Sequence, residues 1–320
     1  MRFIAGVAVG ISLAVAASGS ASLDPFAPEP LSWEPPALSD PIAIRVTNSN
    51  RRLFLDNGRD YLLNIVEPLQ RELWIDGGRN VVVIGGRITI DSTGTSSPYQ
   101  DNTAVKVRSG DPSGTVHLEG LLIDGPYVAD GFAIATARNV QIQNVRVERA
   151  YDNIKNAHAD CVQVQRGVGN LRVDRFTCST ERQGIFLGDH DGPIRSADLR
   201  RVNMYAAGGR HLLWQTTPTY PVSLIDVWLT IAPGFSSWPF GYWTYPQKDG
   251  RTLAGRIDRR RRAVVSRDGK RLWFVGSRIG GVVRKGSPPA GDFVPAGSVG
   301  RSYVSPGYRG QLGDERPHPG

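Results

Sequence analysis

The sequence predicts an all-β protein whose chain winds into a parallel β-helix, a solenoid of stacked coils. Short runs such as Val140–Val147 and Leu171–Phe176 alternate apolar with polar residues, which is typical of strands with one buried face. Two sets of equivalent positions recur at intervals of roughly 23 to 31 residues. The first set is Val105, Phe132, Val162, Ile185 and Leu212, and the second is Gly120, Asn144, Arg175, Arg201 and Asp226. Because one coil cannot bury its apolar face alone, we expect equivalent strands to stack in parallel, about 4.8 Å apart. An antiparallel sandwich of short strands is the alternative, but hairpins do not explain two interleaved sets.

The first 45 residues have the composition of export and linker segments. In residues 1–21, Arg2 precedes an apolar run from Phe3 to Ala17, and small residues follow, which is the pattern of a secretory signal. The run is shorter than the roughly 20 residues that a membrane-spanning helix needs. We therefore expect a secreted or periplasmic mature protein without a membrane span. Residues 22–45 are rich in proline, which predicts an extended leader without regular structure.

Residues 46–250 form the predicted solenoid, a fold that lengthens along one axis without the size limit of a compact domain. The expected strands are 61–65, 81–86, 102–108, 116–120, 130–134, 140–147, 160–164, 171–176, 183–188, 212–214 and 222–229. Residues 251–320 form an atypical basic C-terminal segment, rich in glycine and proline, and we expect loose order from residue 285 onward.

The charge of the chain bears on its partners. The formal net charge is +8 and the isoelectric point is about 9.7. A basic protein outside the cytoplasm is suited to an anionic polymer such as a polysaccharide of uronic acids. Export argues against nucleic acid as the partner. The alternative is a solvated surface with a local excess of arginine, part of which lies in 256–262.

The chain contains two cysteines, Cys161 and Cys178. After export such a pair is oxidised in most proteins. Two thiols without clustered histidines provide too few ligands for a structural metal. We therefore expect a disulfide, which would stabilise the fold by about 3 kcal/mol according to the chain-entropy account.

Polar residues recur at the start of successive coils. Alignment of the coils predicts one column that contains Asp130, Asp160, Gln183 and Arg210. The other polar positions expected nearby are Lys106, His158, Gln163, Asp189 and His190. Two stacked carboxylates repel each other, so the pKa of one should rise, which suits a general acid beside a general base. The structural alternative is a ladder of polar turns in which each carboxylate accepts backbone N–H groups.

The central block resembles the polygalacturonases, glycoside hydrolase family 28. Asp160–Val164, then Cys178 and Gln183–Gly188, are similar to that family's D-D-C-[VI]-A-I, second Cys and G-H-G-[LI]-S-I-G. Upstream, Ala129–Ile134 is similar to its N-T-D-G-I-D-I. The resemblance implies a right-handed parallel β-helix of the pectin-lyase-like type, and it supports pairing of the two cysteines.

The sequence departs from that family at four places. Ala159 stands where the family has the first Asp of D-D, Gln183 stands where it has His, and Val128-Ala129 replaces N-T. No R-I-K occurs, and Arg210-His211 is the nearest basic element. His158-x-Asp160-x-x-Gln163 also resembles the H-x-D-x-x-Q run of exported β-helix proteins, which indicates a divergent branch.

These features predict an exported enzyme that acts on an acidic polysaccharide. We expect Asp130 and Asp160 to be the acid/base pair, and the other polar residues of the column and its neighbours to bind substrate. A hydrolase needs no cofactor, whereas a lyase would use a nearby Lys or Arg as base and a divalent cation such as calcium. The alternative is a non-catalytic β-helix that binds polysaccharide or serves as a structural element of the cell envelope. We expect a monomer in either case.

Overall fold

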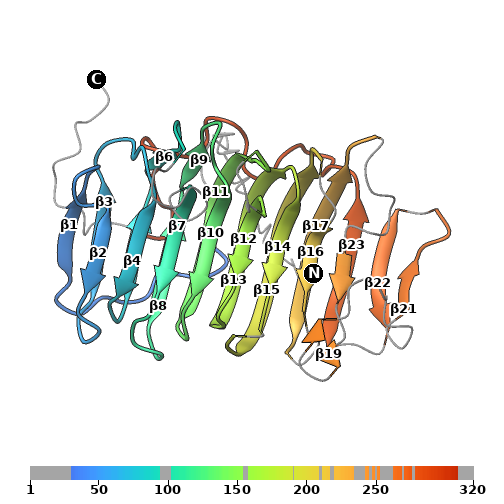
Figure 1. Ribbon diagram of the computed structural model, residues 1–320, viewed down its shortest axis with the longest axis horizontal. Coiled ribbons are helices and arrows are strands. Elements are labelled where there is room, and N and C mark those ends of the chain that lie inside the picture. The colour runs from blue at the N-terminus through green and yellow to red at the C-terminus, as the bar shows by residue number, and fades with distance from the viewer. Residues whose placement is uncertain are drawn as a thin grey trace, which may run out of the picture.

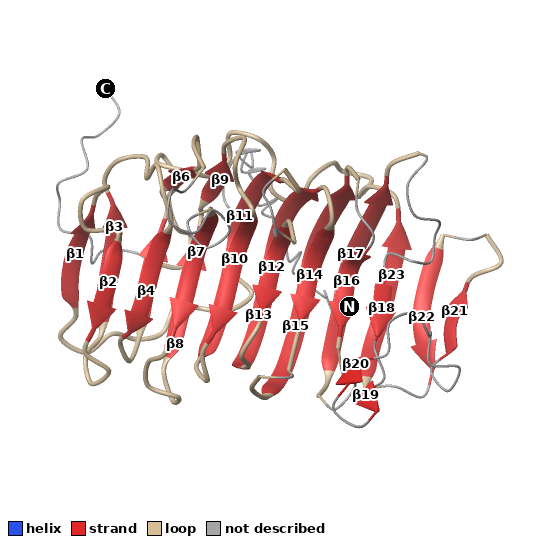
Figure 2. Cartoon of the chain, in the orientation of Figure 1, coloured by secondary structure: helices blue, strands red, loops and turns tan. Residues whose placement is uncertain are grey.

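The computed structural model is an all-β protein in the part of the chain that it describes (Figure 2). The described residues are 30–93, 102–153, 158–189, 191–208, 211–216, 220–233, 242–244, 247–248, 251–252, 262–268, 270–275 and 278–308. The expected signal and the two site candidates His190 and Arg210 therefore lie outside the described residues. Among the described segments, no helix is long and apolar enough to cross a bilayer.

Most strands belong to two long sheets that face each other along the length of the molecule (Figure 1). The first sheet contains, in spatial order, β1 (Ile42–Val46), β3 (Tyr61–Ile65), β5 (Val81–Ile84), β8 (Thr115–Glu119), β11 (Asn139–Ala150), β13 (Val168–Thr180), β15 (Ile194–Ala206), β17 (Val222–Ile231), β23 (Ile279–Lys285), β22 (Arg271–Val275) and β21 (Arg262–Val265). Two short strands, β6 (Arg87–Thr89) and β9 (Leu122–Asp124), extend it, because β6 pairs with β9 and β9 pairs with β11.

The second sheet contains, in spatial order, β18 (Tyr242–Thr244), β16 (His211–Gln215), β14 (Gln183–Leu187), β12 (Asp160–Val164), β10 (Asp130–Ala135), β7 (Thr103–Arg108), β4 (Leu73–Gly77) and β2 (Arg52–Leu55). All of its pairs are parallel. From β10 to β18 the chain alternates between the two sheets at every strand. Antiparallel pairing occurs among β21, β22 and β23, and between β19 (Gln247–Lys248) and β20 (Arg251–Thr252).

The main hydrophobic core lies between the two sheets and is built by alternate residues of each strand. Val105, Phe132, Val162 and Ile185 occupy equivalent positions in neighbouring strands, as predicted. The predicted fifth member, Leu212, is wrong by one residue, because Ile185 pairs with Leu213.

The second predicted set coincides with a bend in the first sheet. Its members have a positive φ angle between 44° and 70°, and they are Gly120, Asn144, Arg175, Arg201 and Asp226, preceded by Gly85. The pairing of the flanking residues puts successive members beside each other. The long strands β11, β13, β15 and β17 therefore bend at the same height. Asparagine and aspartate tolerate this conformation, whereas each arginine costs about 1 kcal/mol there.

The cysteines form the predicted disulfide between Cys161 and Cys178. Cys161 belongs to β12 in the second sheet and Cys178 to β13 in the first, so the bond joins the two sheets across the core. Such a bond is typical of proteins that fold in an oxidising compartment.

The described part of the proline-rich leader lies on the outer face of the first sheet. The backbone N–H of Trp33 donates to the side chain of Gln143 at 3.2 Å, and the Gln143 amide donates to the Trp33 carbonyl at 2.6 Å. The Trp33 ring also receives two guanidinium groups, Arg200 at 4.6 Å and Arg172 at 5.7 Å from its centroid. Residues 30–41 have no regular structure, as predicted, but β1 begins at Ile42, so the expected end of the leader at residue 45 is wrong by four residues. The contacts of Trp33 fix the described part of the leader to the sheet.

Residues 286–308 run back along the first sheet, toward the N-terminal end of the stack (Figure 1, red). Ser287 hydrogen-bonds Tyr205 of β15 at 2.7 Å, and the Gly300 N–H donates to the Gly120 carbonyl beyond β8 at 2.8 Å. The expected loose order from residue 285 onward is therefore wrong for this part of the segment. Residues 309–320 lie outside the described residues.

Tyr303 anchors this returning segment. Its hydroxyl donates to Glu119 at 2.6 Å and accepts from the Asn144 amide at 2.7 Å. Glu119 in turn pairs with the buried ring of His117 at 2.9 Å. Burial raises the pKa of Tyr303, and the Glu119 charge adds to the effect. A β-carbon at Gly120 would lie 2.0 Å from the Tyr303 ring, so the close approach requires glycine at that bend.

Candidate functional site

The candidate site lies where the strands of the second sheet begin. Asp130 of β10 pairs with Thr103, and Asp160 of β12 pairs with Gln183 of β14. Asp130 and Asp160 precede Phe132 and Val162, which pair with each other, by the same two residues. The predicted column of Asp130, Asp160 and Gln183 is therefore confirmed as a row across parallel strands.

The same row corrects the fourth predicted member. Gln183 pairs with His211, whereas the sequence alignment assigned Arg210 to that place. Arg210 itself lies outside the described residues. The error is the same one-residue shift that affects Leu212.

The row is buried at the start of the second sheet. Asp130 and Asp160 are fully buried, and Gln183 is 8% exposed. The two residues after Asp160, Cys161 and Val162, both belong to the hydrophobic core, so the alternation of a regular strand does not assign the Asp160 side chain to either face of the sheet. Other parts of the chain cover the row.

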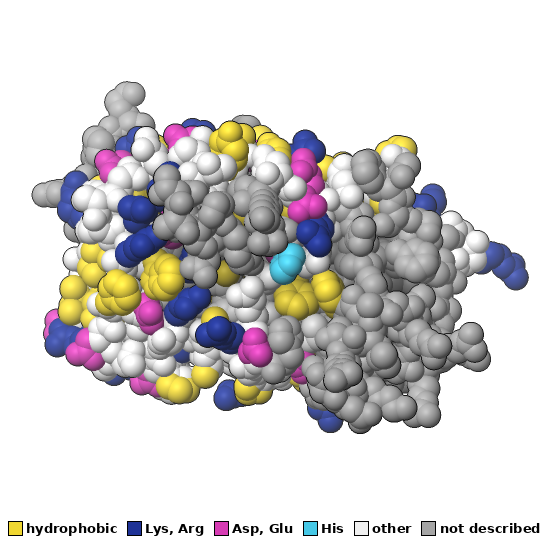
Figure 3. All heavy atoms as spheres, in the orientation of Figure 1, with side chains coloured by type: hydrophobic (Ala, Val, Ile, Leu, Met, Phe, Trp, Pro, Cys, Tyr) yellow, Lys and Arg dark blue, Asp and Glu magenta, His cyan; other side chains and the backbone are white. Residues whose placement is uncertain are grey.

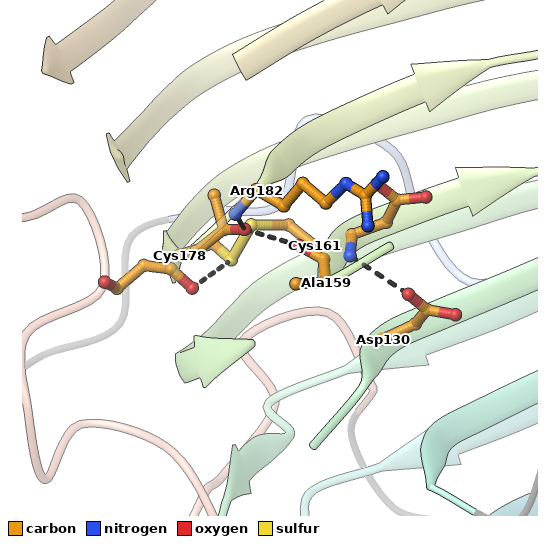
Figure 4. The surroundings of a disulfide bond; sticks show 8 residues. Asp130, Ala159, Cys161, Cys178 and Arg182 are labelled. Carbon is orange, nitrogen blue, oxygen red and sulfur yellow. Dashed lines mark hydrogen bonds between the residues drawn. A yellow bond between two sulfur atoms is a disulfide. The ribbon is translucent and has the colours of Figure 1, made fainter. Parts of the chain in front are cut away.

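Asp130 has a structural partner in the next strand. Its Oδ1 accepts the backbone N–H of Asp160 at 3.0 Å, and its Oδ2 accepts the Thr103 hydroxyl at 3.4 Å. Figure 4 shows the side chain of Asp130 directed toward the strand that carries the disulfide. The contact to a backbone N–H is the one expected of a polar turn ladder, so that alternative accounts for part of the role of Asp130.

Asp160 is different. Neither of its carboxyl oxygens accepts a hydrogen bond from the described part of the chain. Burial raises its pKa well above the ordinary value, the charge of Asp130 raises it further, and the cation of Arg182 lowers it. A buried carboxyl without donors favours the protonated form. Asp160 therefore favours the protonated form beside Asp130, and the turn-ladder alternative does not explain it.

The turn into β12 is under local backbone constraint. Ala159 has a φ of 50°, a left-handed conformation that costs a non-glycine residue about 1 kcal/mol. The Thr180 hydroxyl makes a short hydrogen bond to the Ala159 carbonyl and accepts the backbone N–H of Arg182 at 3.0 Å. Thr180 therefore holds Ala159, next to Asp160, and Arg182 in one arrangement.

His158 and Gln163 lie close to the pair and contact each other. The Gln163 amide approaches Nδ1 of His158 at 3.2 Å, and Gln165 donates to the Gln163 oxygen at 2.8 Å. Partial desolvation lowers the pKa of His158, Arg182 adds to this effect, and Asp152 opposes it.

Lys106 lies on the outward face of the second sheet, on the other side of β10. It is 5% exposed, and its Nζ lies 5.0 Å from the centroid of the Trp74 ring. Arg108 and Arg52 also approach that ring, at 4.8 and 5.9 Å. Figure 3 shows hydrophobic and Lys or Arg side chains next to one another at the end of the molecule where β2 and β4 lie. The aromatic member of this cluster, Trp74, was not predicted.

Asp189 lies at the opposite end of β14 from Gln183. Its N–H donates to the Thr216 hydroxyl at 3.1 Å, and its carboxylate accepts from the same hydroxyl at 2.7 Å. The four residues of β14 that follow Gln183 separate it from the row by about 13 Å or more. Asp189 therefore closes a turn away from the pair, and its predicted neighbour His190 lies outside the described residues.

Sequence reasoning missed Arg182 and Thr180. Arg182 directly precedes Gln183, a recognised member of the column, so its proximity to the turn could have been read from the alignment. The Thr180 hydroxyl that accepts the Arg182 N–H lies only two residues before it, which is the local arrangement of an ST turn. The contact that no local pattern predicts is the one from the same hydroxyl to the Ala159 carbonyl, 21 residues away. Within the described residues, no group of three or more His, Cys, Asp or Glu side chains is placed to bind a metal.

Comparisons with known proteins give no relative for this chain. No protein-family model matches it, and neither a curated protein nor a solved structure matches it.

Proposed function

We propose that this protein is a divergent, right-handed parallel β-helix of the pectin-lyase-like type, and that it hydrolyses an acidic polysaccharide outside the cytoplasm. The alternation of the chain between two parallel sheets supports the winding. The disulfide supports an oxidising compartment. The motifs shared with polygalacturonases support the reaction class.

Asp160 is the general acid and Asp130 the general base of the proposed reaction. The observation that carries this assignment is the state of Asp160, a fully buried carboxyl that receives no hydrogen bond from the described residues beside a second carboxyl. Such an environment keeps one carboxyl protonated while the other is ionised, which is the division of roles that glycoside hydrolysis needs. Asp130, which accepts two hydrogen bonds, is suited to the ionised role.

The proposed ligand face is that of the second sheet. The described parts of both terminal segments lie on the first sheet, through Trp33 at one end of the chain and Tyr303 at the other. The outward row of the second sheet contains Trp74, Lys106 and Gln163 at paired positions on either side of β10. Aromatic faces suit sugar rings, and cations suit carboxylates.

The test is a screen of the purified protein against uronic-acid polymers, with product analysis. We expect new reducing ends without the absorbance of an unsaturated product, and loss of about 10²- to 10⁴-fold in rate for Asp160→Asn. Asp198→Asn, which removes a carboxylate from the first sheet, is the control and should retain activity. Unsaturated products would instead identify a lyase and lead us to test a divalent cation. Full activity of Asp160→Asn would refute the assignment.

The second candidate is a non-catalytic polysaccharide-binding or structural protein. The full burial of both carboxyls favours it, because a catalytic pair must meet its substrate. On this reading, polymer binding by Asp160→Asn would equal that of the wild-type protein, and no product would form with either.

A further inference from the structure

Arg182 lies at the junction between the buried carboxyl pair and the surface. It directly precedes β14, and its backbone is fixed by the Thr180 hydroxyl that also binds the Ala159 carbonyl. Figure 4 shows its side chain extended past the Cys161–Cys178 disulfide, on the same side as Asp130. Its backbone is therefore anchored beside Asp160 while its guanidinium reaches outward.

The guanidinium of Arg182 is held by an acidic surface residue. Its Nη1 lies 3.2 Å from Oδ1 of Asp152, and the two side chains are 38% and 40% exposed. An ion pair with this exposure contributes little to stability, because solvent screens both charges. Exchange of Asp152 for another carboxylate would therefore cost little.

The charge of Arg182 also reaches two other groups of the site. It lowers the pKa of Asp160, against the effects of burial and of Asp130, and it lowers the pKa of His158. The positive charge of Arg182 thus favours the ionised form of Asp160.

We propose that Arg182 binds the carboxylate of the acidic sugar unit held at Asp130 and Asp160, and that Asp152 is its partner only while the site is empty. This inference rests on the proposed function and names the residue that selects an acidic ligand. The planar guanidinium fork matches a carboxylate in geometry as well as charge. A ligand carboxylate on Arg182 would also reduce the pull of that cation on Asp160, so binding would keep the acid protonated.

The test compares two variants that break the same ion pair, Arg182→Gln and Asp152→Asn. Binding of a galacturonate oligomer and of its fully methyl-esterified, uncharged form is measured by calorimetry. We expect Arg182→Gln to weaken binding of the acidic oligomer by about 10- to 100-fold and to leave binding of the ester within about twofold. Asp152→Asn should strengthen binding of the acidic oligomer, because it removes the competitor. Arg182→Lys should retain part of the selectivity, since it keeps the charge without the fork.

A purely structural role for the ion pair predicts the same direction of change for both variants. Equal weakening by Arg182→Gln and Asp152→Asn, or unchanged preference for the acidic oligomer in Arg182→Gln, would overturn the inference and leave the proposed function standing. Wild-type protein that binds neither oligomer would overturn both. Thermal melts of each variant show whether a loss of binding reflects a loss of folding.

Discussion

Arg138 joins three successive strands of the second sheet, and its replacement is the sharpest test of the stacked arrangement. The side chain is fully buried. Its Nη1 donates to the carbonyls of Gly77 at 2.7 Å and Gly78 at 3.0 Å, where β4 ends, and its Nη2 donates to the carbonyl of Arg108, the last residue of β7, at 3.0 Å. Its Nε donates to the Thr136 hydroxyl beyond β10 at 3.3 Å.

The expected cost of Arg138→Met follows from these contacts. Three hydrogen bonds from a charged donor to carbonyls contribute about 2 kcal/mol each, or about 6 kcal/mol together. Burial lowers the pKa of Arg138 from 12.5 to about 10, which corresponds to an opposing cost of about 3 kcal/mol. Methionine fills similar space without donors, so the net loss should be about 3 kcal/mol. For a chain of this length that lowers the melting temperature by about 4–5 °C.

The assay is thermal and urea unfolding followed by circular dichroism. Arg195→Met is the matched control, because Arg195 is exposed on β15, and it should melt within about 1 °C of the wild-type protein. A melting temperature for Arg138→Met within the same margin would refute the view that one buried guanidinium holds these strands together.

Four further predictions concern the carboxyls, the disulfide and the returning segment. The hydrogen bond from Arg79 lowers the pKa of Asp60 from 3.8 to about 2, so Asp60→Asn should cost about 2 kcal/mol at neutral pH, less any screening by solvent. Because a depressed carboxyl pKa stabilises only above its unfolded value, urea titrations should show this difference above pH 4 and its disappearance near pH 2. Asp160 has a raised pKa, so the native protein retains a proton that the unfolded chain releases, and stability should fall as the pH rises above 3.8. Asp160→Asn should remove that fall in melts across pH 3–8, and parallel curves would contradict the burial of an unpaired carboxyl. Replacement of both disulfide cysteines by alanine should cost about 3 kcal/mol in urea unfolding. Tyr303→Phe should cost about 1–3 kcal/mol, because Oε1 of the buried Glu119 loses the hydroxyl that donates to it, and protease cleavage within 286–308 should become faster.

The recurrence of apolar residues was enough to predict most strands between residues 61 and 229 and most of their register. It missed several strands of the two long sheets, among them β1, β2, β4, β15 and β23. The second set of equivalent positions, which begins at Gly120, was correct at every member. Residues of several types occupy it, and all of them lie at the same bend of the first sheet. The first set failed only at Leu212. Both Leu212 and Leu213 are buried, so hydrophobicity could not decide between them. A register error of one residue therefore put Arg210, instead of His211, beside Gln183 in the predicted row.

The candidate site was predictable only in part. Asp130, Asp160 and Gln183 share one row because equal spacing along the chain becomes adjacency in a parallel sheet. The difference between the two carboxyls was not predictable. The difference depends on which carboxyl oxygens accept a backbone N–H from the neighbouring strand. The register between the two strands decides that. Arg182 was missed because its ion-pair partner, Asp152, lies 30 residues earlier in the chain.

The sequence by itself determined the all-β class, the spacing of the repeated strands, the cysteine pair and the alignment of the polar row, because each depends on periodicity along the chain. Only the tertiary structure decided that Asp160 is buried without a donor among the described residues, that Arg182 pairs with Asp152, and that the described parts of both terminal segments lie on the first sheet. Those features depend on contacts between residues far apart in the chain, such as Tyr303 with Glu119, and a local pattern carries no information about which distant group will fill a given place.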